Sequence, residues 1–341
     1  ESQGMYFSGP DVRYGSNYNQ STGETAADVL ADYEAEFGEV PAAPFWAHSY
    51  DAAALLMDAI AAASYDDGGT LVIDRAGVRE FLNGVSNYSG LIGLMSCDEY
   101  GDCSSSKITV IQNIDINDYG VSTANVVYEY APLGSAQVGD IAADHLGDGS
   151  LGVVEVGPGE AIQIRSLNAI SGDVAFLGIP NQRGVELAIA DYGPIGGHDV
   201  TIGAGMDDLC SADGGQAAAQ ILVADQDVVG VIGTSCSGAA TAASPLISAA
   251  GMVMISGSNT SPALTSDLAG TAGKNYHAGY YRTAHNDLYQ GAAAANFALD
   301  VLGVSTAAAI HDGDPYTEGL ATAFADAFKA GGGTITGFTA V

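Results

Sequence analysis

Two short apolar segments, each followed by small polar residues, limit the folds open to this chain more than any other feature. Residues 228–233 are apolar, run into Thr-Ser-Cys-Ser-Gly, and lead to an alanine-rich stretch over 239–250. Residues 252–255 are again apolar and precede the polar segment 256–262. Short apolar runs that end in turn residues predict buried strands, and the alanine-rich stretch predicts a helix. The two polar segments should therefore meet at one edge of an open α/β sheet, where ligands bind.

The first polar turn has the chemistry of an anion site. A strand that passes through Thr-Ser-Cys-Ser into a helix leaves free backbone N–H groups at the helix N-terminus. These groups and the neighbouring hydroxyls favour a negatively charged partner, which we interpret as a carboxylate. An ordinary helix cap is the alternative, and the second polar turn favours the binding site.

Composition excludes several classes of function. The 341 residues suffice for two domains, and 9 Lys and Arg stand against 41 Asp and Glu, for a formal net charge of −32. Nucleic-acid binding and docking on anionic lipid both need a basic surface, so we expect neither. The charge is spread along the chain, as on a solvated surface. No stretch is long and apolar enough to span a membrane.

Four cysteines allow three pairings. Cys97 and Cys103 are close enough in sequence for a local disulfide across a turn, whereas Cys210 and Cys236 each follow a predicted strand. The spacing matches no common zinc pattern, so we expect no metal site. The even number favours an oxidising compartment, with buried free thiols as the alternative.

The chain changes in composition over residues 131–152, which read as a linker. After it, strands and helices alternate with short loops, which predicts an α/β fold with a parallel sheet covered on both faces. The predicted helices are 22–37, 45–63, 74–82, 178–191, 214–224, 239–250, 286–302 and 316–330. The predicted strands are 88–95, 107–114, 125–130, 161–167, 200–203, 228–233, 252–255, 306–311 and 334–341.

Six segments of the second half together resemble the N-terminal lobe of a type I periplasmic binding protein. They are most similar to the branched-chain amino-acid (Leu/Ile/Val) substrate-binding component of ABC transporters, particularly versions from Chloroflexota. The resemblance implies a two-lobe fold with doubly wound parallel sheets. The segments are Ile170-Ser171-Gly172, 184–189, Asp207-Asp208-Leu209-Cys210, 231–238, 254–265 and 311–320.

Segments of the first third resemble the same family, but the end of its C-terminal lobe. The resemblance implies the closing half of the C-lobe over 1–131, a linker over 132–152 and the N-lobe over 153–341. The first part of the C-lobe has no counterpart here, so that lobe is incomplete or completed from elsewhere. A circular permutant, a segment of a tandem array and an incomplete part of a longer chain remain open. The matching segments are 4–11, 45–52, 88–93 and 125–130.

The resemblance also implies which residues bind a ligand. Ser237 should hold an α-carboxylate, with Thr234, Ser235 and Cys236 contributing mainly backbone. At the next turn, the Thr260 hydroxyl and the Ser258 carbonyl should contact the amino group and carboxylate of the ligand. Asn259 lies between them and is expected to bind or to point into the sheet.

Two aromatic residues and a disulfide complete the implied site. Phe45 matches a residue that packs on the ligand side chain, and Tyr316 matches an aromatic near the cleft. Their alternatives are a helix-start core residue and a helix-capping tyrosine. Cys210 and Cys236 match a disulfide pair of the family. The acid and tyrosine that clamp the ligand ammonium in the family have no counterpart, so no clamp is assigned.

These patterns predict an extracytoplasmic solute-binding protein that captures a small branched-chain amino acid or an amide by lobe closure. The implied partner is an ABC transporter permease. We expect no cofactor and no enzymatic activity, because no nucleophile completes the sets His285-Asn286-Asp287 and His311-Asp312. The alternative is a structural or assembly protein whose lobes complete one another between chains.

Overall fold

A twisted parallel sheet organises most of the molecule. The computed structural model describes residues 2–104, 106–132 and 145–341. The sheet has the strand order β10-β9-β12-β13-β14, with β11 also beside β9, and all of its pairs are parallel. The predicted α/β class is therefore confirmed. The strands are β9 (Ile162–Asn168), β10 (Val200–Thr201), β11 (Met206–Asp207), β12 (Val228–Gly233), β13 (Val253–Ser256) and β14 (Tyr280–Arg282).

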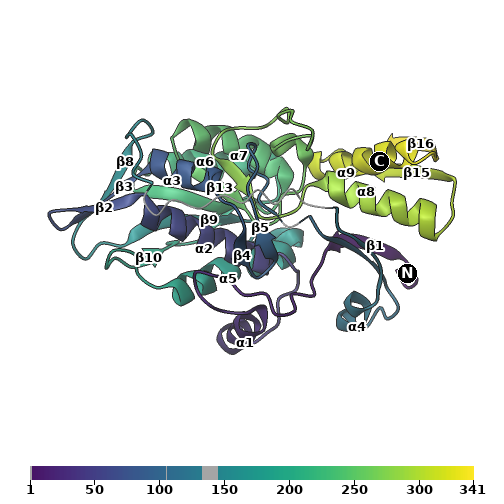
Figure 1. Ribbon diagram of the computed structural model, residues 1–341, viewed down its shortest axis with the longest axis horizontal. Helices are drawn as coiled ribbons and strands as arrows, with labels where there is room; N and C mark the ends of the chain where they lie inside the picture. The colour runs from purple at the N-terminus through teal and green to yellow at the C-terminus, as the bar shows by residue number, and fades with distance from the viewer. Residues whose placement is uncertain (1, 105, 133–144) are drawn as a thin grey trace.

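Helices cover both faces of this sheet, as Figure 1 shows. One face packs against α6 (Ala212–Ala224) and α7 (Ser237–Ala249), and the other against α2 (Trp46–Ala62) and α5 (Ala175–Tyr192). The strands are buried on both sides, which explains why β12 reads as a continuous apolar run without alternation.

Helix α2 packs against the parallel sheet although it comes from the N-terminal third of the chain. It contacts α5, β12 and β13, and most of its residues are buried. A Cβ atom on Gly184 would lie only 2.4 Å from the Trp46 carbonyl oxygen, so glycine permits the close approach of α5 to α2. The helix is apolar on nearly all sides because this environment surrounds it.

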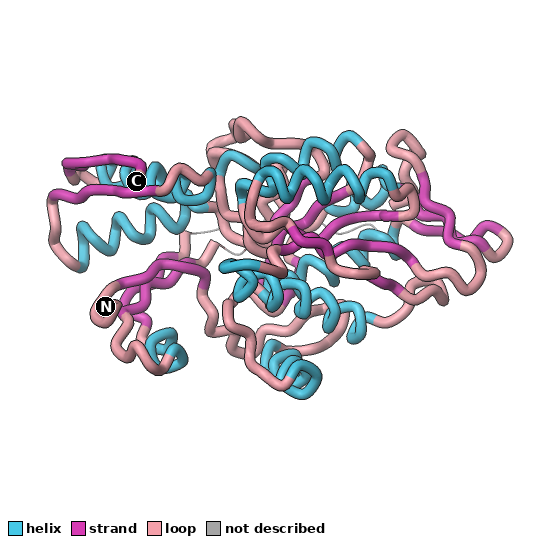
Figure 2. The backbone as a smooth tube through the Cα atoms, turned by 180° about the vertical axis from the view of Figure 1, so that it is seen from behind, coloured by secondary structure: helices cyan, strands magenta, loops and turns pink. Residues whose placement is uncertain are grey.

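A second, antiparallel group of strands lies at the other end of the molecule. Helix α8 packs on the sheet β1-β6-β7, and α9 packs on α8 and on the parallel pair β15-β16. Figures 1 and 2 both show the two chain termini at this end. The elements are β1 (Tyr6–Pro10), β6 (Ile108–Gln112), β7 (Val126–Tyr130), α8 (Asp287–Asn296), β15 (Thr306–His311), α9 (Pro315–Ala330) and β16 (Thr334–Ala340).

Helix packing crosses the boundary between residues 1–131 and 153–341, since α2 lies on the parallel sheet and α8 lies on strands β1, β6 and β7. The parallel sheet ends at β14, and the residues after it join strands from the N-terminal third. Phe297 at the end of α8 shows the physical reason, because its ring packs 4.9 Å from the ring of Tyr6 and 5.9 Å from that of Tyr128. Such long-range burial leaves no local sequence signal.

Smaller differences concern the connections. The predicted strand 88–95 is a hairpin of β4 (Tyr88–Gly90) and β5 (Gly93–Met95). A three-stranded antiparallel sheet was not predicted. It joins β2 (Ser64–Asp67), β3 (Thr70–Asp74) and β8 (Val153–Val156). The remaining helices are α1 (Ala26–Phe37), α3 (Arg75–Asn83) and α4 (Tyr119–Ala124).

Most of the predicted linker 132–152 lies outside the described residues. Its last part, which is described, packs against the fold: the His145 N–H donates to the Ala62 carbonyl at 3.0 Å. The Gly149 N–H donates to Asp74 Oδ2 at 2.8 Å. These bonds attach the segment before β8 to the ends of α2 and β3.

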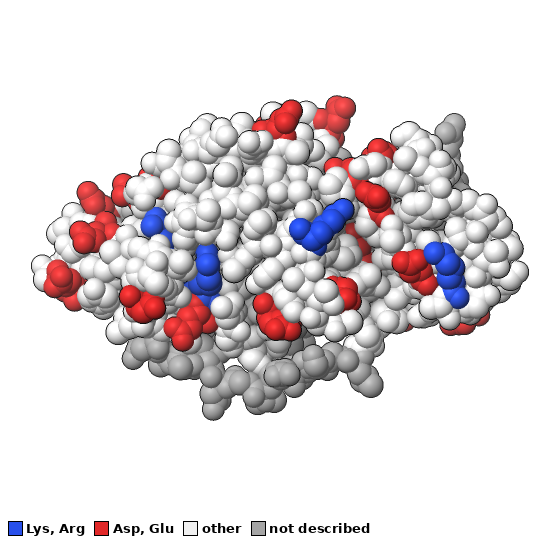
Figure 3. All heavy atoms as spheres, turned by 90° about the horizontal axis from the view of Figure 1, so that it is seen from above, with Lys and Arg blue, Asp and Glu red and all other residues white. Residues whose placement is uncertain are grey.

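The surface carries the acidic character of the sequence. Figure 3 shows one face, on which acidic side chains are scattered and do not form a single patch. Across the described ranges, no helix combines the length and apolarity needed to cross a lipid bilayer.

Candidate functional site

A cavity of about 810 Å³ lies between the parallel sheet and the antiparallel end of the molecule. Its walls come from the turns after β12 and β13, the start of α5, strands β1 and β6, and the start of α9. The structure brings together at this cavity all of the predicted ligand-binding residues except Thr234 and Asn259. The predicted residues that line it are Phe45, Ser235, Cys236, Ser237, Ser258, Thr260 and Tyr316.

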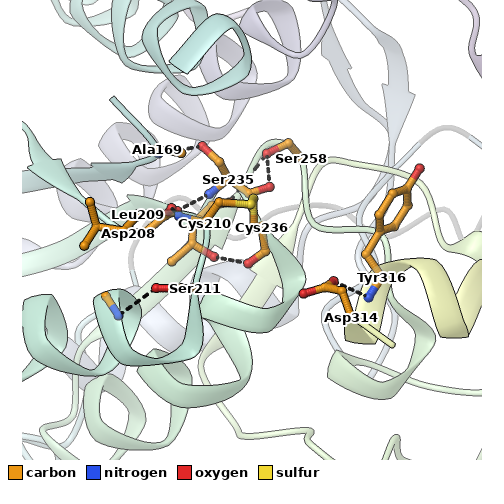
Figure 4. The surroundings of a disulfide bond; sticks show 12 residues. Ala169, Asp208, Leu209, Cys210, Ser211, Ser235, Cys236, Ser258, Asp314 and Tyr316 are labelled. Carbon is orange, nitrogen blue, oxygen red and sulfur yellow. Dashed lines mark hydrogen bonds between the residues drawn. A yellow bond between two sulfur atoms is a disulfide. The ribbon is translucent and has the colours of Figure 1, made fainter. Parts of the chain in front are cut away.

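The N-terminus of α7 opens on this cavity. Ser237 begins the helix, and the preceding Cys236 makes no capping hydrogen bond with its side chain. The first-turn N–H groups therefore lack the side-chain acceptor that an ordinary helix cap would supply. The Asp314 carboxylate is the nearby negative group: a Cβ atom on Gly238 would lie 2.8 Å from its Oδ2. Asp314 Oδ1 itself accepts from the Tyr316 N–H, at 2.8 Å, and so caps α9 (Figure 4).

Ser235 holds the turn in place through both its backbone and its hydroxyl. Its Oγ donates to Asn168 Oδ1 and accepts from the Ala169 N–H, both at 3.0 Å. Its N–H donates to Asp208 Oδ2 at 2.7 Å (Figure 4). The hydroxyl and the backbone N–H of Ser235 are thus both engaged within the protein, so this residue stabilises the turn.

A buried carboxylate and a disulfide brace the same turn. Asp208 Oδ1 accepts from the Cys210 N–H at 2.7 Å, and Cys210 is bonded to Cys236. Burial raises the pKa of Asp208 to about 6, although hydrogen bonds from backbone N–H groups oppose the shift. Cys97 is bonded to Cys103, so both predicted disulfides are present. None of the four cysteines is free.

The second turn is tied to the first by hydrogen bonds around the Thr234 carbonyl. That oxygen accepts from Ser256 Oγ at 2.8 Å and from Asn259 Nδ2 at 2.9 Å. The Tyr280 hydroxyl donates to Asn259 Oδ1 at 3.1 Å. Asn259 is fully buried and does not line the cavity, so its side chain links strands β12, β13 and β14. Of its two predicted orientations, the structure has the inward one.

Ser258 is nearly saturated by protein partners. Its Oγ donates to the Ser235 carbonyl at 3.0 Å and accepts from Asn181 Nδ2 at 3.1 Å. Its side chain therefore positions the turn, and contact with a ligand is left to its backbone.

Thr260 and Asp287 are neighbouring buried polar residues, and the sequence alone gives no sign that they meet. Thr260 lines the cavity, and its buried Oγ1 has no hydrogen-bond partner within the described chain. Both carboxyl oxygens of Asp287 likewise lack a partner there. Burial raises the pKa of Asp287 to about 7, while the adjacent Thr260 hydroxyl, outside hydrogen-bond geometry, acts in the opposite direction.

The aromatic wall contains one residue that the sequence reasoning missed. Phe45 and Tyr316 line the cavity, and Phe176 from the start of α5 joins them. Phe176 is 59% exposed, which is unusual for a phenylalanine and marks it as a cavity residue. Nothing in its local sequence separates it from an ordinary core residue.

Over the part of the chain that the structure describes, no group of three or more His, Cys, Asp or Glu side chains is placed to hold a metal ion.

Several known proteins are similar to this chain. The leucine-specific-binding protein of Salmonella typhimurium is 33% identical over 194 residues, which is 56% of this chain and 50% of that protein. The Leu/Ile/Val-binding protein of Escherichia coli K12 is 32% identical over 185 residues, covering 53% of this chain and 48% of that protein. A leucine-binding protein from Thermotoga maritima shares 22% identity and a TM-score of 0.47, over 53% of this chain and 49% of that one.

The chain spans about half the length of the curated relatives that it matches. The family described as "Periplasmic binding protein" matches residues 161–341, which is more than half of the 341 residues. The predicted resemblance of the second half is therefore confirmed, and the chain belongs to the periplasmic binding protein family.

Proposed function

We propose that this chain binds a small amino acid of the branched-chain type, or a related amide, as the solute-binding component of an ABC transporter. The observation that carries the proposal is the uncapped N-terminus of α7, which opens on a cavity of about 810 Å³. The relatives support it, because they are named as leucine-binding and Leu/Ile/Val-binding proteins. Those names also favour a binding protein over an enzyme or an assembly protein.

The ligand carboxylate would bind at the first turn of α7. Backbone N–H groups there point towards the ligand, and the helix dipole favours negative charge. The unpartnered Thr260 hydroxyl can accept a hydrogen bond from the ligand ammonium. Phe45, Phe176 and Tyr316 would then enclose the side chain, since apolar walls with a few polar groups are typical of small-molecule sites.

Lobe closure would follow from the position of the cavity. One wall belongs to the parallel sheet, and the opposite wall comes from β1, β6 and α9. We therefore place one lobe around the parallel sheet, including α2, and the other around β1, β6, β7, α8, α9, β15 and β16. Movement of these lobes about the segments that connect them, among them the one after β14, would open and close the site.

The proposed location is outside the cytoplasm, where a transporter permease would be the partner. Two disulfides support this location, because such bonds persist in oxidising compartments.

Calorimetric titration with a panel of amino acids and short amides tests the proposal. Ser237→Asp should weaken binding of any responding amino acid at least about tenfold, since a fixed charge would repel the carboxylate. Ser237→Asn is the matched control, being equal in size and uncharged, and should weaken binding far less. Failure of every compound to bind, or equal effects of the two substitutions, would refute the proposal.

A further inference from the structure

His285 lies in the cavity wall with one ring nitrogen unused. It follows β14, precedes α8, and is only 2% exposed. Its Nδ1 is buried and has no hydrogen-bond partner among the described residues. His48 has a similar unpaired Nδ1, but it does not line the cavity.

A chain of hydrogen bonds determines which nitrogen of His285 carries the proton. Gln290 Nε2 donates to the Ser8 carbonyl at 2.9 Å and to Ser8 Oγ at 3.1 Å. Gln290 Oε1 is thereby turned towards His285 Nε2, at 2.6 Å. An amide oxygen only accepts, so Nε2 carries the hydrogen. Burial lowers the pKa of His285 to about 4, so the ring is neutral at pH 7 and Nδ1 is a hydrogen-bond acceptor.

The position of this acceptor indicates which part of a ligand would reach it. The Phe45 ring lies 6.4 Å from the His285 ring, with 26° between their planes, and both residues line the cavity. The proposed carboxylate site is at the start of α7, which follows β12, whereas His285 follows β14, and β13 separates these two strands in the sheet. A ligand anchored there would direct its side chain, and not its carboxylate, towards Phe45 and His285.

We propose that His285 Nδ1 accepts a hydrogen bond from the ligand side chain and so selects ligands that carry a hydroxyl or amide donor. This inference rests on the proposed amino-acid site and narrows its ligand class. A buried acceptor without a partner is costly, so a ligand that satisfies it gains over an aliphatic one of the same shape.

Threonine and valine provide the test, since they have nearly the same shape and differ by a hydroxyl in place of a methyl group. Calorimetry on the 341-residue chain should show threonine binding about tenfold more tightly than valine. His285→Phe should reduce the ratio of the two affinities to about one. His285→Asn keeps an acceptor near the position of Nδ1 and should retain the preference. His198→Phe, on a partly exposed residue outside the cavity, should leave the ratio unchanged.

A second measurement does not depend on the folding of any variant. In protein with ¹⁵N-labelled histidine, threonine should shift the Nδ1 resonance of His285, and valine should shift it much less. Equal affinities for threonine and valine in the unmodified chain would overturn the inference and leave the proposed function standing. Binding of neither threonine, valine nor any other amino acid would overturn the proposed function, and this inference with it.

Discussion

Replacing Asp287 by asparagine should stabilise the protein at neutral pH and above. Its carboxyl group is fully buried at the start of α8, and its two oxygens lack partners in the described structure. Desolvation by burial raises the pKa of this group from 3.8 to about 7. An ionised carboxylate is therefore expensive there, and an amide of the same shape carries no charge to bury.

The sign and size of the effect follow from the two pKa values. Between about pH 4 and pH 7 the unfolded chain releases a proton that native Asp287 keeps, so native stability falls as pH rises through this window. Above pH 7 the loss is complete. A shift of roughly 3 units, at about 1.4 kcal/mol each, gives an upper bound of roughly 4 kcal/mol.

Urea denaturation at pH 4.5, 6 and 8 would measure the effect. The free energy of unfolding of Asp287→Asn, relative to the unmodified chain, should rise across this series. Burial also raises the pKa values of Asp51 and Asp208 to about 6, but their contributions cancel in this difference. Asp32→Asn, on the exposed side of α1, controls for the loss of one negative charge from an acidic protein. A pH-independent difference, or destabilisation at pH 8, would refute the reasoning.

Two further predictions concern the disulfides and the ion pairs of the protein. Replacing both cysteines of the Cys210–Cys236 bond with alanine should lower the free energy of unfolding by about 3.5 kcal/mol. The same replacement at the Cys97–Cys103 bond should lower it by only about 2 kcal/mol, because this bond closes a shorter loop. Denaturant titration of the two double variants checks the order, and a larger loss for the shorter loop would contradict it. Arg282→Met should cost about 3–5 kcal/mol because it leaves buried Asp102 without its cation, whereas Lys329→Met, at an exposed pair, should cost less than about 1 kcal/mol. Similar losses of thermal stability in these two variants would show that burial of the pair is not the deciding factor.

Local sequence determined the elements around the ligand site. The run of β12 into Thr-Ser-Cys-Ser and α7 was predictable because an apolar strand, a polar turn and an alanine-rich helix each leave a short-range signal. The same holds for β13 and its polar turn. The two disulfides agree with the local spacing of Cys97 and Cys103 and with the family resemblance of Cys210 and Cys236.

Tertiary structure alone decided how these elements are shared between the two ends of the molecule. Helix α2 lies on the parallel sheet, and α8 leaves it for strands of the N-terminal third, because both helices bury their apolar residues against partners distant in sequence. The inward orientation of Asn259 and the exposure of Phe176 depend on the same packing. Desolvation, which no sequence pattern measures, gives His285 and Asp287 their altered pKa values. The sequence thus specified strands, turns and helices, whereas long-range burial specified the walls of the cavity and the charges within them.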